Sequence, residues 1–227
     1  MTDLKFDDPI SGSGDLPTVS RPPLHKPGKI VCIGRNYSEH AKELGNEVPT
    51  EPLFFLKPST SLIQDGEPIV LPVQSERVEF EGEIGIVIGS RLTKASESEA
   101  VAGIRGIIAL NDVTARDLQK KDSQWTRAKG FDTFCPVGPM AEGVPDLSIL
   151  VVITRVNGVE RQRALASEMV FSIPMLLSYV SHVMTLEPGD LVATGTPAGV
   201  GPLKAGDVVE VEIEGVSRVS NPVVGPR

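Results

Sequence analysis

The sequence predicts a mainly β fold with a few short helices, in the α+β class. Glycine and proline are plentiful, at 22 and 19 of 227 residues, aromatic residues make up only 4%, and runs of β-branched residues recur along the chain. Glycine and proline mark turns, and β-branched side chains suit a pleated sheet. The length suits one domain, or one domain with an arm, that buries a sizeable core. We therefore expect a β-rich domain with many turns.

The first residues of the chain are expected to precede the domain. Residues 1–27 contain a Ser-Gly-Ser-Gly stretch, further prolines and no sustained periodicity. This composition is typical of an arm or an irregular lead-in, so the domain is expected over 28–227. Its first elements are expected to be a buried strand over 29–33, a helix over 38–44 that ends at Gly45, and a strand over 53–56.

The remaining strands are expected in five segments, 69–90, 104–113, 134–140, 148–156 and 189–215. Two helices are expected to interrupt them. One covers 114–121, where Thr114 and Asp117 resemble a capping box with Asp in place of Glu. The other covers 172–184, with Pro174 in a first turn that does not need its N–H. Because this second helix is apolar on most faces, we expect it to be buried in the core or in a subunit contact.

Composition and charge exclude several classes of partner. The net charge is -8 and no basic cluster occurs, which argues against nucleic-acid binding. No apolar stretch is long enough to span a bilayer, and the N-terminus does not resemble a signal peptide. Cys32 and Cys135 match no metal or redox spacing and have apolar neighbours. We expect buried free thiols in a cytoplasmic protein with no membrane partner.

Three acidic residues form the first candidate site. Glu81 and Glu83 lie in an apolar run over 78–89, and because side chains alternate along a strand, both point to one face. Two like charges at this short distance, next to buried residues, repel each other unless a cation compensates them. A divalent cation prefers carboxylate oxygens, and Asp112, at the end of the apolar strand from 104, can supply a third ligand.

A simpler interpretation of these acids is also open. Glu81 and Glu83 can lie on a solvated strand face, or pair with Arg77 and Arg91. Glu79 shares their face, as a fourth acid or as a hydrogen-bonding partner of the ligands.

A histidine and a glutamate form the second candidate site. His40 and Glu43 are three residues apart on the first helix, so the carboxylate can orient the imidazole as a general base for water. The alternative is an exposed helix that carries one histidine. His25 lies in the arm and His182 in an apolar helix, which leaves His40 as the best-placed histidine.

Four further residues can bind a substrate. Arg116 and Gln119 share one face of the helix after Asp112 and can bind a carboxylate or carbonyl, although Arg116 can instead pair with Asp117 or Asp122. Lys129 is either a surface charge or a stabiliser of an oxyanion. The glycine-rich turn 194–201 lacks the lysine of a phosphate loop, and we expect it to present backbone N–H groups and the Thr196 hydroxyl to a small polar ligand.

Together these segments resemble the fumarylacetoacetate hydrolase family, in the short single-domain branch that includes acylpyruvate hydrolases. The resemblance covers nearly everything after residue 28. The blocks that carry it are Ile-Gly-Arg-Asn-Tyr-Ser-Glu-His at 33–40, Phe-Leu-Lys-Pro-Ser-Thr at 55–60, Glu-Gly-Glu at 81–83, Asp-Val-Thr-Ala-Arg-Asp-Leu-Gln at 112–119, Arg-Ala-Lys-Gly-Phe at 127–131, Phe-Ser-Ile-Pro at 171–174 and Thr-Gly-Thr-Pro-Ala-Gly-Val-Gly at 194–201.

The resemblance implies a mixed β-sandwich roll, found as a homodimer, and roles for the candidate residues. The implied metal ligands are Glu81, Glu83 and Asp112, with Mg²⁺ or Mn²⁺ as the ion. Lys129 is implied to face the substrate, His40 and Glu43 to activate water on a lid that orders when substrate binds, and Arg116, Gln119 and Thr196 to contact substrate oxygens. Thr133 matches a position near a cation in larger relatives, and Glu79 and Phe80 stand where some hydrolases of the family carry two histidines.

The implied chemistry is cleavage of a small 2-oxo or 2,4-dioxo acid. A 2,4-dioxo acid can chelate a divalent ion through its carboxylate and 2-oxo oxygens. Water activated by His40 and Glu43 would attack the distal carbonyl, and cleavage of the C3–C4 bond would release pyruvate as its enolate, stabilised by Lys129 and the ion.

Other outcomes of the same site remain open. If the substrate loses its carboxylate as CO2 and no water attacks a carbonyl, the enzyme is an oxaloacetate decarboxylase. If the enolate is only reprotonated at another position, the enzyme is an isomerase or tautomerase. A non-catalytic, cation-stabilised binding module is the alternative from another class.

Overall fold

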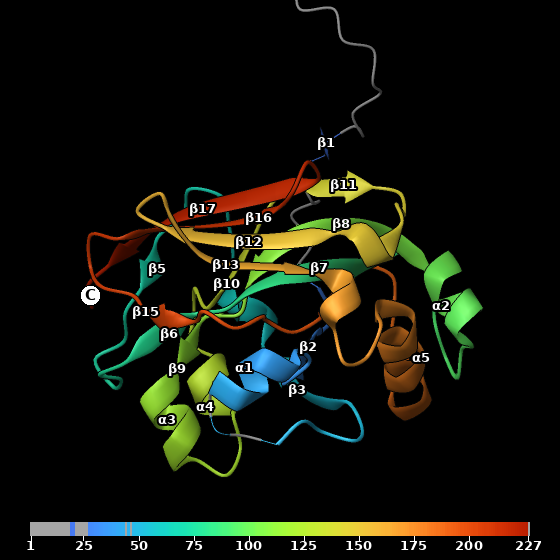
Figure 1. Ribbon diagram of the computed structural model, residues 1–227, viewed down its shortest axis with the longest axis horizontal. Coiled ribbons are helices and arrows are strands. Elements are labelled where there is room, and N and C mark those ends of the chain that lie inside the picture. The colour runs from blue at the N-terminus through green and yellow to red at the C-terminus, as the bar shows by residue number, and fades with distance from the viewer. Residues whose placement is uncertain (1–18, 21–26, 44, 46, 227) are drawn as a thin grey trace, which may run out of the picture.

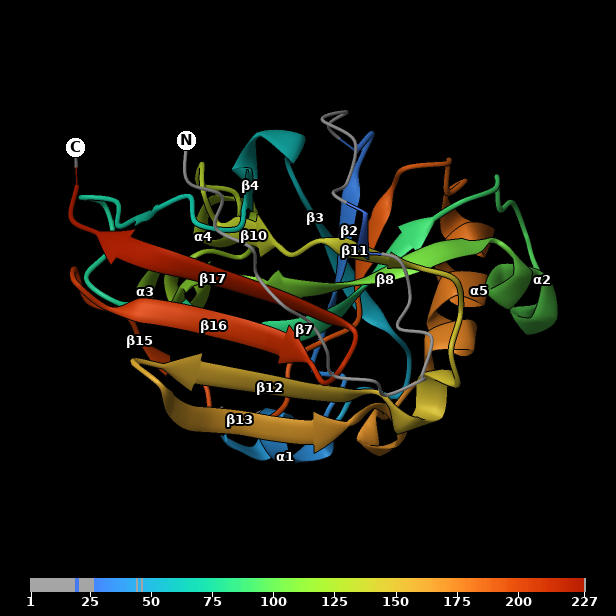
Figure 2. The same cartoon turned by 90° about the horizontal axis from the view of Figure 1, so that it is seen from above.

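The computed structural model describes residues 19–20, 27–43, 45 and 47–226. Strands dominate and the helices are short, which confirms the mainly β fold class. Three sheets build the domain, and the two larger ones lie one above the other (Figures 1 and 2). Of the predicted arm, the short strand β1 (Val19–Ser20) joins the largest sheet. The rest of 1–26, including His25, lies outside the described residues.

The largest sheet has nine strands, in the order β1-β11-β8-β7-β14-β2-β3, with β10 pairing to β8 and β4. The strands after β1 are β2 (Ile30–Gly34), β3 (Leu53–Lys57), β4 (Leu62–Gln64), β7 (Gly82–Ile88), β8 (Ile104–Asn111), β10 (Cys135–Val137), β11 (Met140–Glu142) and β14 (Leu191–Ala193). Strand β14 is parallel to β2, and β7 is antiparallel to both β14 and β8. The carboxyl ends of β2, β14 and β8 therefore lie beside the start of β7, and the candidate residues cluster at this end of the sheet.

Two smaller sheets complete the β structure. A five-stranded sheet has the order β13-β12-β16-β17-β5, and a three-stranded sheet has the order β15-β6-β9. Their strands are β5 (Ile69–Val70), β6 (Val78–Phe80), β9 (Thr114–Ala115), β12 (Val151–Val156), β13 (Val159–Leu165), β15 (Gly201–Pro202), β16 (Val208–Ile213) and β17 (Ser217–Val224). Figure 2 shows β12, β13, β16 and β17 side by side.

The core follows the two-residue period of the strands. Ile84, Ile86 and Ile88 of β7 belong to the hydrophobic cluster that they share with Val152 and other residues of the five-stranded sheet. Val87, on the opposite face of β7, belongs to a different buried cluster. Both faces of β7 are thus covered, so an acidic side chain at its start is buried whichever way it points.

Five α-helices lie within the described residues, α1 (Ser38–Glu43), α2 (Glu97–Ala102), α3 (Arg116–Lys121), α4 (Thr126–Lys129) and α5 (Ile173–Val183). Figure 1 shows α1, α3 and α4 gathered together near β2, β3 and β9, while α2 and α5 lie at the other side of the domain. The first group carries most of the candidate residues that are not on strands.

The predicted capping box at Thr114 is wrong. Ala115 is the N-cap residue of α3 and makes no side-chain cap hydrogen bond. Thr114 instead pairs with Glu79 in the small sheet, and its hydroxyl donates to the carbonyl of Asp112 at 2.8 Å. A capping box does occur at the start of α2, where Ser96 and Glu99 exchange hydrogen bonds.

The other predicted helix agrees with the structure. Ser172 is the N-cap residue of α5, its hydroxyl accepts from the N–H of Met175 at 3.4 Å, and Pro174 lies in the first turn. One face of α5 is buried, although Val183 is 58% exposed.

Two of the longer strands, β13 and β17, lie outside every predicted segment, as do the short strands β1 and β4. Strand β13 is at the edge of its sheet, and only Gln162 and Ala164 are buried, so its sequence lacks an apolar pattern. Strand β17 alternates between buried and exposed residues, but Ser217 and Asn221 occupy two of the buried positions. Neither strand shows the alternation of apolar residues that predicts a strand.

The two cysteines are buried and free, as predicted. Burial raises the pKa of Cys135 to about 12, and it also raises the pKa of Cys32. No helix among the described residues is long and apolar enough to cross a membrane.

Candidate metal and substrate site

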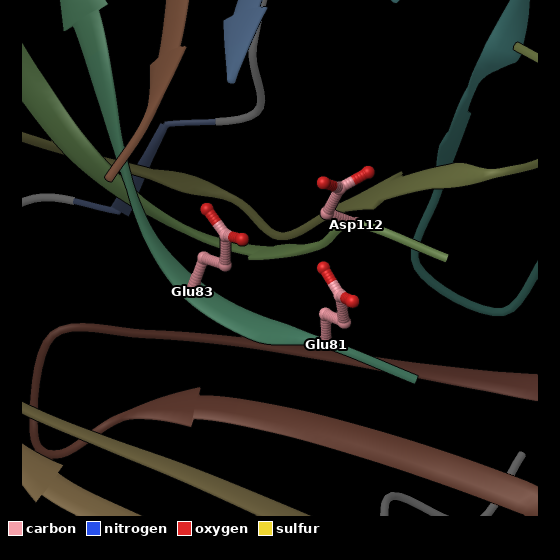
Figure 3. Close-up of side chains that lie close together, drawn as sticks. All are labelled: Glu81, Glu83 and Asp112. Atoms are coloured by element: carbon pink, nitrogen blue, oxygen red, sulfur yellow. The ribbon is translucent and has the colours of Figure 1, made fainter. Parts of the chain in front are cut away.

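The three predicted metal ligands come together in the structure. One carboxylate oxygen from each of Glu81, Glu83 and Asp112 lies within 4.8 Å of the others. The pairing of β7 with β8 places Gly82 opposite Asn111, and the N–H of Asp112 donates to the carbonyl of Glu81 at 2.8 Å. All three side chains are buried, at 4%, 1% and 1% exposure. Figure 3 shows their carboxylates around a common space.

The interpretation of these acids as a solvated face is wrong, because buried cations contact two of them. The ammonium of Lys129 lies 2.6 Å from Glu81 and 2.6 Å from Asp112. The second Asp112 oxygen lies 2.6 Å from the ammonium of Lys57. Burial by itself would lower the pKa of Lys129. The negative charges of Asp112 and Glu81 outweigh this effect and hold the pKa of Lys129 above its usual range. Lys129 is therefore a charged ammonium and not a surface group.

Glu81 has a second cationic partner. The guanidinium of Arg116 lies 2.5 Å from Glu81 and 2.6 Å from Glu79. Burial by itself would raise the pKa of Glu81. The positive charges of Lys129 and Arg116 outweigh this effect and hold the pKa of Glu81 well below its usual range. Glu81 is therefore ionised.

Arg77 and Arg91 do not pair with the trio, since Arg77 contacts Glu79 and Arg91 contacts Glu187. Arg116 does not pair with Asp117 or Asp122. The carboxylate of Asp122 contacts Arg127, and Asp117 accepts from the hydroxyl of Ser75. Glu79 therefore serves as the partner that holds Arg116.

Glu83 differs from the other two acids. It accepts a hydrogen bond from the N–H of Gly195 at 2.7 Å, but among the described residues no cationic side chain lies within 4.0 Å of it. Burial, with Asp112 and Glu81 nearby, raises the pKa of Glu83 well above its usual value. This carboxylate lacks a positive partner.

The residues fit a divalent cation on charge as well as on distance. Four buried carboxylates, those of Glu79, Glu81, Glu83 and Asp112, face three buried cations, those of Lys57, Arg116 and Lys129. Arg77 also contacts Glu79, so among the described residues Glu83 is the acid of this cluster that has no cationic partner. A hard ion such as Mg²⁺ or Mn²⁺, bound by the oxygens of the trio, would compensate this buried carboxylate.

The predicted pair of His40 and Glu43 is formed. Nδ1 of His40 lies 3.1 Å from Glu43, and His40 is only 4% exposed, so the alternative of an exposed helix is wrong for this histidine. The carboxylate of Glu43 also accepts from the N–H of Gly199, at 3.1 and 3.2 Å to its two oxygens. This contact connects α1 to the glycine-rich turn.

The glycine-rich turn mainly supports other residues of the site. Its N–H groups at Gly195 and Gly199 donate to Glu83 and Glu43. Gly195 has a φ of 102°, and a Cβ there would lie 2.7 Å from the Cβ of Asn36, so only glycine fits. The Thr196 hydroxyl donates to the carbonyl of Gly82 at 2.9 Å and accepts from the Gln162 amide at 2.8 Å.

A cavity of about 190 Å³ opens over this cluster. Its lining comprises Ile33, Gly34, Arg35, His40, Phe55, Glu81, Glu83, Arg116, Gln119, Lys120, Trp125, Lys129 and Thr196. Seven predicted site residues are in this lining. Of the other two, Asp112 contacts Lys129, and Glu43 contacts His40. The side-chain carbonyl of Gln119 accepts from Arg116 at 2.5 Å.

Sequence analysis alone did not single out Lys57, Arg35 or Trp125. The only signal for Lys57 was a charge at the end of an apolar strand, and the structure buries that side chain fully. The hydroxyl of Thr133, which the resemblance matches to a position near a cation in larger relatives, accepts from the N–H of Val70 at 2.9 Å.

Comparison with known proteins agrees with this geometry. The sequence profile of the fumarylacetoacetate (FAA) hydrolase C-terminal family matches residues 29–224. This chain belongs to the fumarylacetoacetate hydrolase family. Among the members, the mitochondrial oxaloacetate tautomerase of Bos taurus is 44% identical over 193 residues, which are 82% of this chain and 87% of that protein.

Solved structures of the family have the same fold. The 5-carboxymethyl-2-hydroxymuconate delta-isomerase from Mycobacterium smegmatis has a TM-score of 0.83 and 44% identity, over 89% of this chain and 80% of that one. The fumarylpyruvate hydrolase from Pseudomonas aeruginosa, in complex with Mn²⁺ and pyruvate, has a TM-score of 0.83 and 28% identity, over 95% of this chain and 99% of that one. These relatives are named for three different reactions, a tautomerisation of oxaloacetate, an isomerisation of a hydroxymuconate and a hydrolysis of fumarylpyruvate.

Proposed function

We propose that this chain is a metal-dependent hydrolase that cleaves the C3–C4 bond of a 2,4-dioxo acid of the acylpyruvate or fumarylpyruvate type, releasing pyruvate and a carboxylic acid. One observation carries the proposal: buried His40, which is paired with Glu43, lines the same small cavity as Glu81, Glu83 and Lys129. A base for water and a charged site for an enolate are thus present together. The likeness to a fumarylpyruvate hydrolase supports the same class of substrate.

Glu81, Glu83 and Asp112 would hold the ion, Mg²⁺ or Mn²⁺. Bound there, such an ion would polarise the 2-oxo group and stabilise the negative charge of an enolate.

His40 and Glu43 would activate water. Glu43 contacts Nδ1 of His40, which favours the tautomer with the proton on Nδ1 and leaves Nε2 as the acceptor. Nε2 would take a proton from water as the water oxygen bonds to C4. The Glu43 carboxylate would stabilise the imidazolium that forms.

Lys129 would stabilise the charge that develops on the leaving fragment. When the C3–C4 bond breaks, its electron pair passes to C3 and gives the enolate of pyruvate. A proton then returns to C3, and the products are pyruvate and the second acid. The ammonium of Lys129 keeps its charge because two carboxylates raise its pKa, so it is suited to face an enolate oxygen. Arg116 and the Gln119 amide would bind substrate oxygens, and Thr196 would do so once its hydroxyl turns from the carbonyl of Gly82.

Oxaloacetate tautomerisation is the second candidate function. It is favoured by the higher identity of this chain to the bovine tautomerase, 44%, than to the fumarylpyruvate hydrolase, 28%. Tautomerisation needs the enolate-stabilising end of the site and a proton donor or acceptor, but no attack by water. Decarboxylation of oxaloacetate would need the same end of the site.

A substrate panel tests the two functions. Acetylpyruvate, fumarylpyruvate and oxaloacetate are assayed with Mg²⁺ and with Mn²⁺, and the products are identified by NMR. We expect pyruvate and the matching acid from a 2,4-dioxo acid, and a loss of this activity in EDTA that added metal restores. Full hydrolysis by metal-free protein would contradict the proposal.

Replacing His40 by alanine separates the mechanisms. Hydrolysis should fall by about 10²- to 10⁴-fold, the usual contribution of a general base, while oxaloacetate decarboxylation can persist because it needs no activated water. His182→Ala is the matched control, since His182 is exposed and lies outside the cavity lining. Unchanged hydrolysis in His40→Ala would exclude the proposed role of this histidine.

Three further expectations stay predictions. Competition between oxalate and substrate would separate an enzyme from a binding module that holds a metal only for stability. The homodimer implied by the family resemblance can be measured by analytical ultracentrifugation. The cytoplasmic location can be measured by fractionation.

A further inference from the structure

We propose that Arg35 binds a second carboxylate, at the end of the substrate away from the acidic trio, and so selects dicarboxylates over monocarboxylates of the same length. This inference rests on the proposed function and deepens it, because it names the class of 2-oxo acid that the cavity accepts.

The cavity has two chemically different regions. One holds Glu81, Glu83 and Lys129, and the charges of Glu81 and Lys129 are paired within the buried cluster. The lining also includes Arg35, Lys120 and Trp125. Two rings separate Arg35 from Lys129, because Arg35 contacts Trp125, Trp125 lies at the edge of Phe55, and the Lys129 ammonium lies 4.9 Å from the Phe55 centroid. Within the described part of the chain, no carboxylate lies within 4.0 Å of the charged groups of Arg35 or Lys120. Two cations without an ion pair, on a chain whose net charge is -8, make this region attractive to an anion.

The backbone and the packing hold Arg35 in a specific place. Arg35 follows the end of β2 and has a φ of 58°, a conformation that L-residues other than glycine rarely adopt. The residue before it, Gly34, packs against the indole of Trp125, where an added Cβ would lie 3.0 Å from a ring carbon. Trp125 is itself held at the edge of Phe55, with ring centroids 5.3 Å apart. Arg35 is therefore attached to a rigid turn and not to a free loop.

The contact between Arg35 and Trp125 leaves hydrogen-bond donors available. The guanidinium carbon lies 6.0 Å from the centroid of the indole ring. A cation over a ring face interacts with the π electrons and does not use up its N–H groups. No side-chain hydrogen bond of Arg35 to another described residue is present either. The fork of N–H donors can thus bind a carboxylate in a bidentate manner, as guanidinium groups commonly do.

Arg35 is better suited to this role than Lys120. Arg35 is half-buried, whereas Lys120 is exposed on α3. A charge-assisted hydrogen bond is stronger where water is partly excluded, and an exposed lysine is screened. Lys120 therefore adds to the local potential, while Arg35 provides the directed contact.

Two ligands that differ only in the distal carboxylate test the inference. Mn²⁺-loaded protein is titrated by calorimetry with 2-oxoglutarate and with 2-oxopentanoate, which have the same chain length. We expect the wild type to bind 2-oxoglutarate about 10- to 100-fold more tightly, the usual range for a hydrogen bond to a charged group. Arg35→Ala should abolish this preference, and Arg35→Lys, which keeps the charge without the fork, should retain part of it.

Two control variants on α3 sharpen the result. Lys121→Ala changes an exposed lysine outside the cavity lining and should keep the full preference. Lys120→Ala should keep most of it. The inference is overturned if wild type shows no preference, if Arg35→Ala retains it, or if Lys120→Ala alone removes it.

A second measurement locates the distal carboxylate. Trp125 is the only tryptophan of the chain, so its fluorescence reports on this region of the cavity. We expect 2-oxoglutarate to change the emission more than 2-oxopentanoate does. Tight binding of 2-oxoglutarate with no change in emission would place its distal end elsewhere and overturn the assignment.

These outcomes are distinguishable from failure of the proposed function, because none of them requires turnover. If no 2,4-dioxo acid is hydrolysed but the preference depends on Arg35, hydrolysis is excluded and the dicarboxylate site stands. If hydrolysis occurs and Arg35→Ala keeps the preference, only the inference on Arg35 fails.

Discussion

Lys57 shows how a single buried charge can support a metal site without binding the metal. Its ammonium donates to Asp112 at 2.6 Å and to the carbonyl of Val113 at 3.1 Å, and its side chain is fully buried. One ammonium thus fixes the Asp112 carboxylate and satisfies a backbone acceptor. Without Lys57, the Asp112 carboxylate and the Val113 carbonyl would both lose this hydrogen-bond donor.

We expect Lys57→Met to lower the stability of the metal-free protein. The change keeps the length of the side chain but leaves a buried carboxylate short of a cation, and breaking a buried pair typically costs about 3–5 kcal/mol. Lys42→Met is the matched control, because Lys42 pairs with Glu39 on an exposed surface, where a pair is worth about 0–1 kcal/mol. Urea unfolding in EDTA measures both. Equal stability of the two variants would show that Lys57 does not support the site.

The chemistry of individual residues was only partly predictable from the sequence. Glu81, Glu83 and Asp112 were predictable because carboxylates interrupt or end apolar strands, which is costly without compensation. Lys57 also ends an apolar strand, but its position does not say which acid it meets, and Arg35 carries no such signal. The roles of both residues depend on distant groups. Asp112 is 55 residues from Lys57, and Trp125 is far from Arg35 in sequence.

At the scale of elements, the two larger sheets meet closely at Gly82. A Cβ on this residue would lie 1.9 Å from the hydroxyl oxygen of Thr154 on β12 and 3.3 Å from the side-chain oxygen of Gln162 on β13. Because Gly82 stands between Glu81 and Glu83, the separation of the two sheets also determines where these acids lie. The hydroxyl of Thr154 is buried and has no hydrogen-bond partner among the described residues.

Gly82→Ala should therefore destabilise the protein and weaken metal binding. Overpacking a buried contact costs about 1–3 kcal/mol. Adding Thr154→Ala to the same variant removes the clashing hydroxyl and should restore most of the stability, which is a direct test of the cause. Gly201→Ala is the matched control, since its Cβ would make only an ordinary contact at 3.5 Å with Phe80. Thermal unfolding of the four proteins measures the effect, and no rescue in the double variant would exclude this explanation.

The elements themselves were predictable where burial is complete. The expected segments around 29–33, 53–56 and 69–90 contain strands because apolar residues dominate there. Strand β13 was missed because an edge strand buries few side chains, and β17 because Ser217 and Asn221 occupy inward positions. The capping box at Thr114 failed because pairing with Glu79 in the small sheet holds this threonine in a strand.

At the scale of the whole molecule, the site joins segments that are distant in the sequence. The carboxyl ends of β2, β8 and β14 and the start of β7 meet at one end of the large sheet. Asp112 approaches Glu81 and Glu83 only when β7 and β8 are paired. The complete set of ligands therefore exists only in the folded chain, and metal binding is coupled to folding of the entire domain.

We expect Mn²⁺ to raise the unfolding temperature of the wild type. Binding to the folded state alone adds about 2.7 kcal/mol when the free metal is about 100 times its dissociation constant.

Glu83→Gln should behave in the opposite way. It removes a carboxylate that has no cationic partner among the described residues, so the metal-free protein should be as stable as the wild type or more stable, while the gain with Mn²⁺ is lost. Glu97→Gln, on an exposed position of α2, is the control that should keep the full gain. Differential scanning calorimetry with EDTA and with Mn²⁺ measures both effects. A loss of metal-free stability in Glu83→Gln, or an unchanged gain with Mn²⁺, would contradict the assignment of Glu83 as a ligand that only a bound cation compensates.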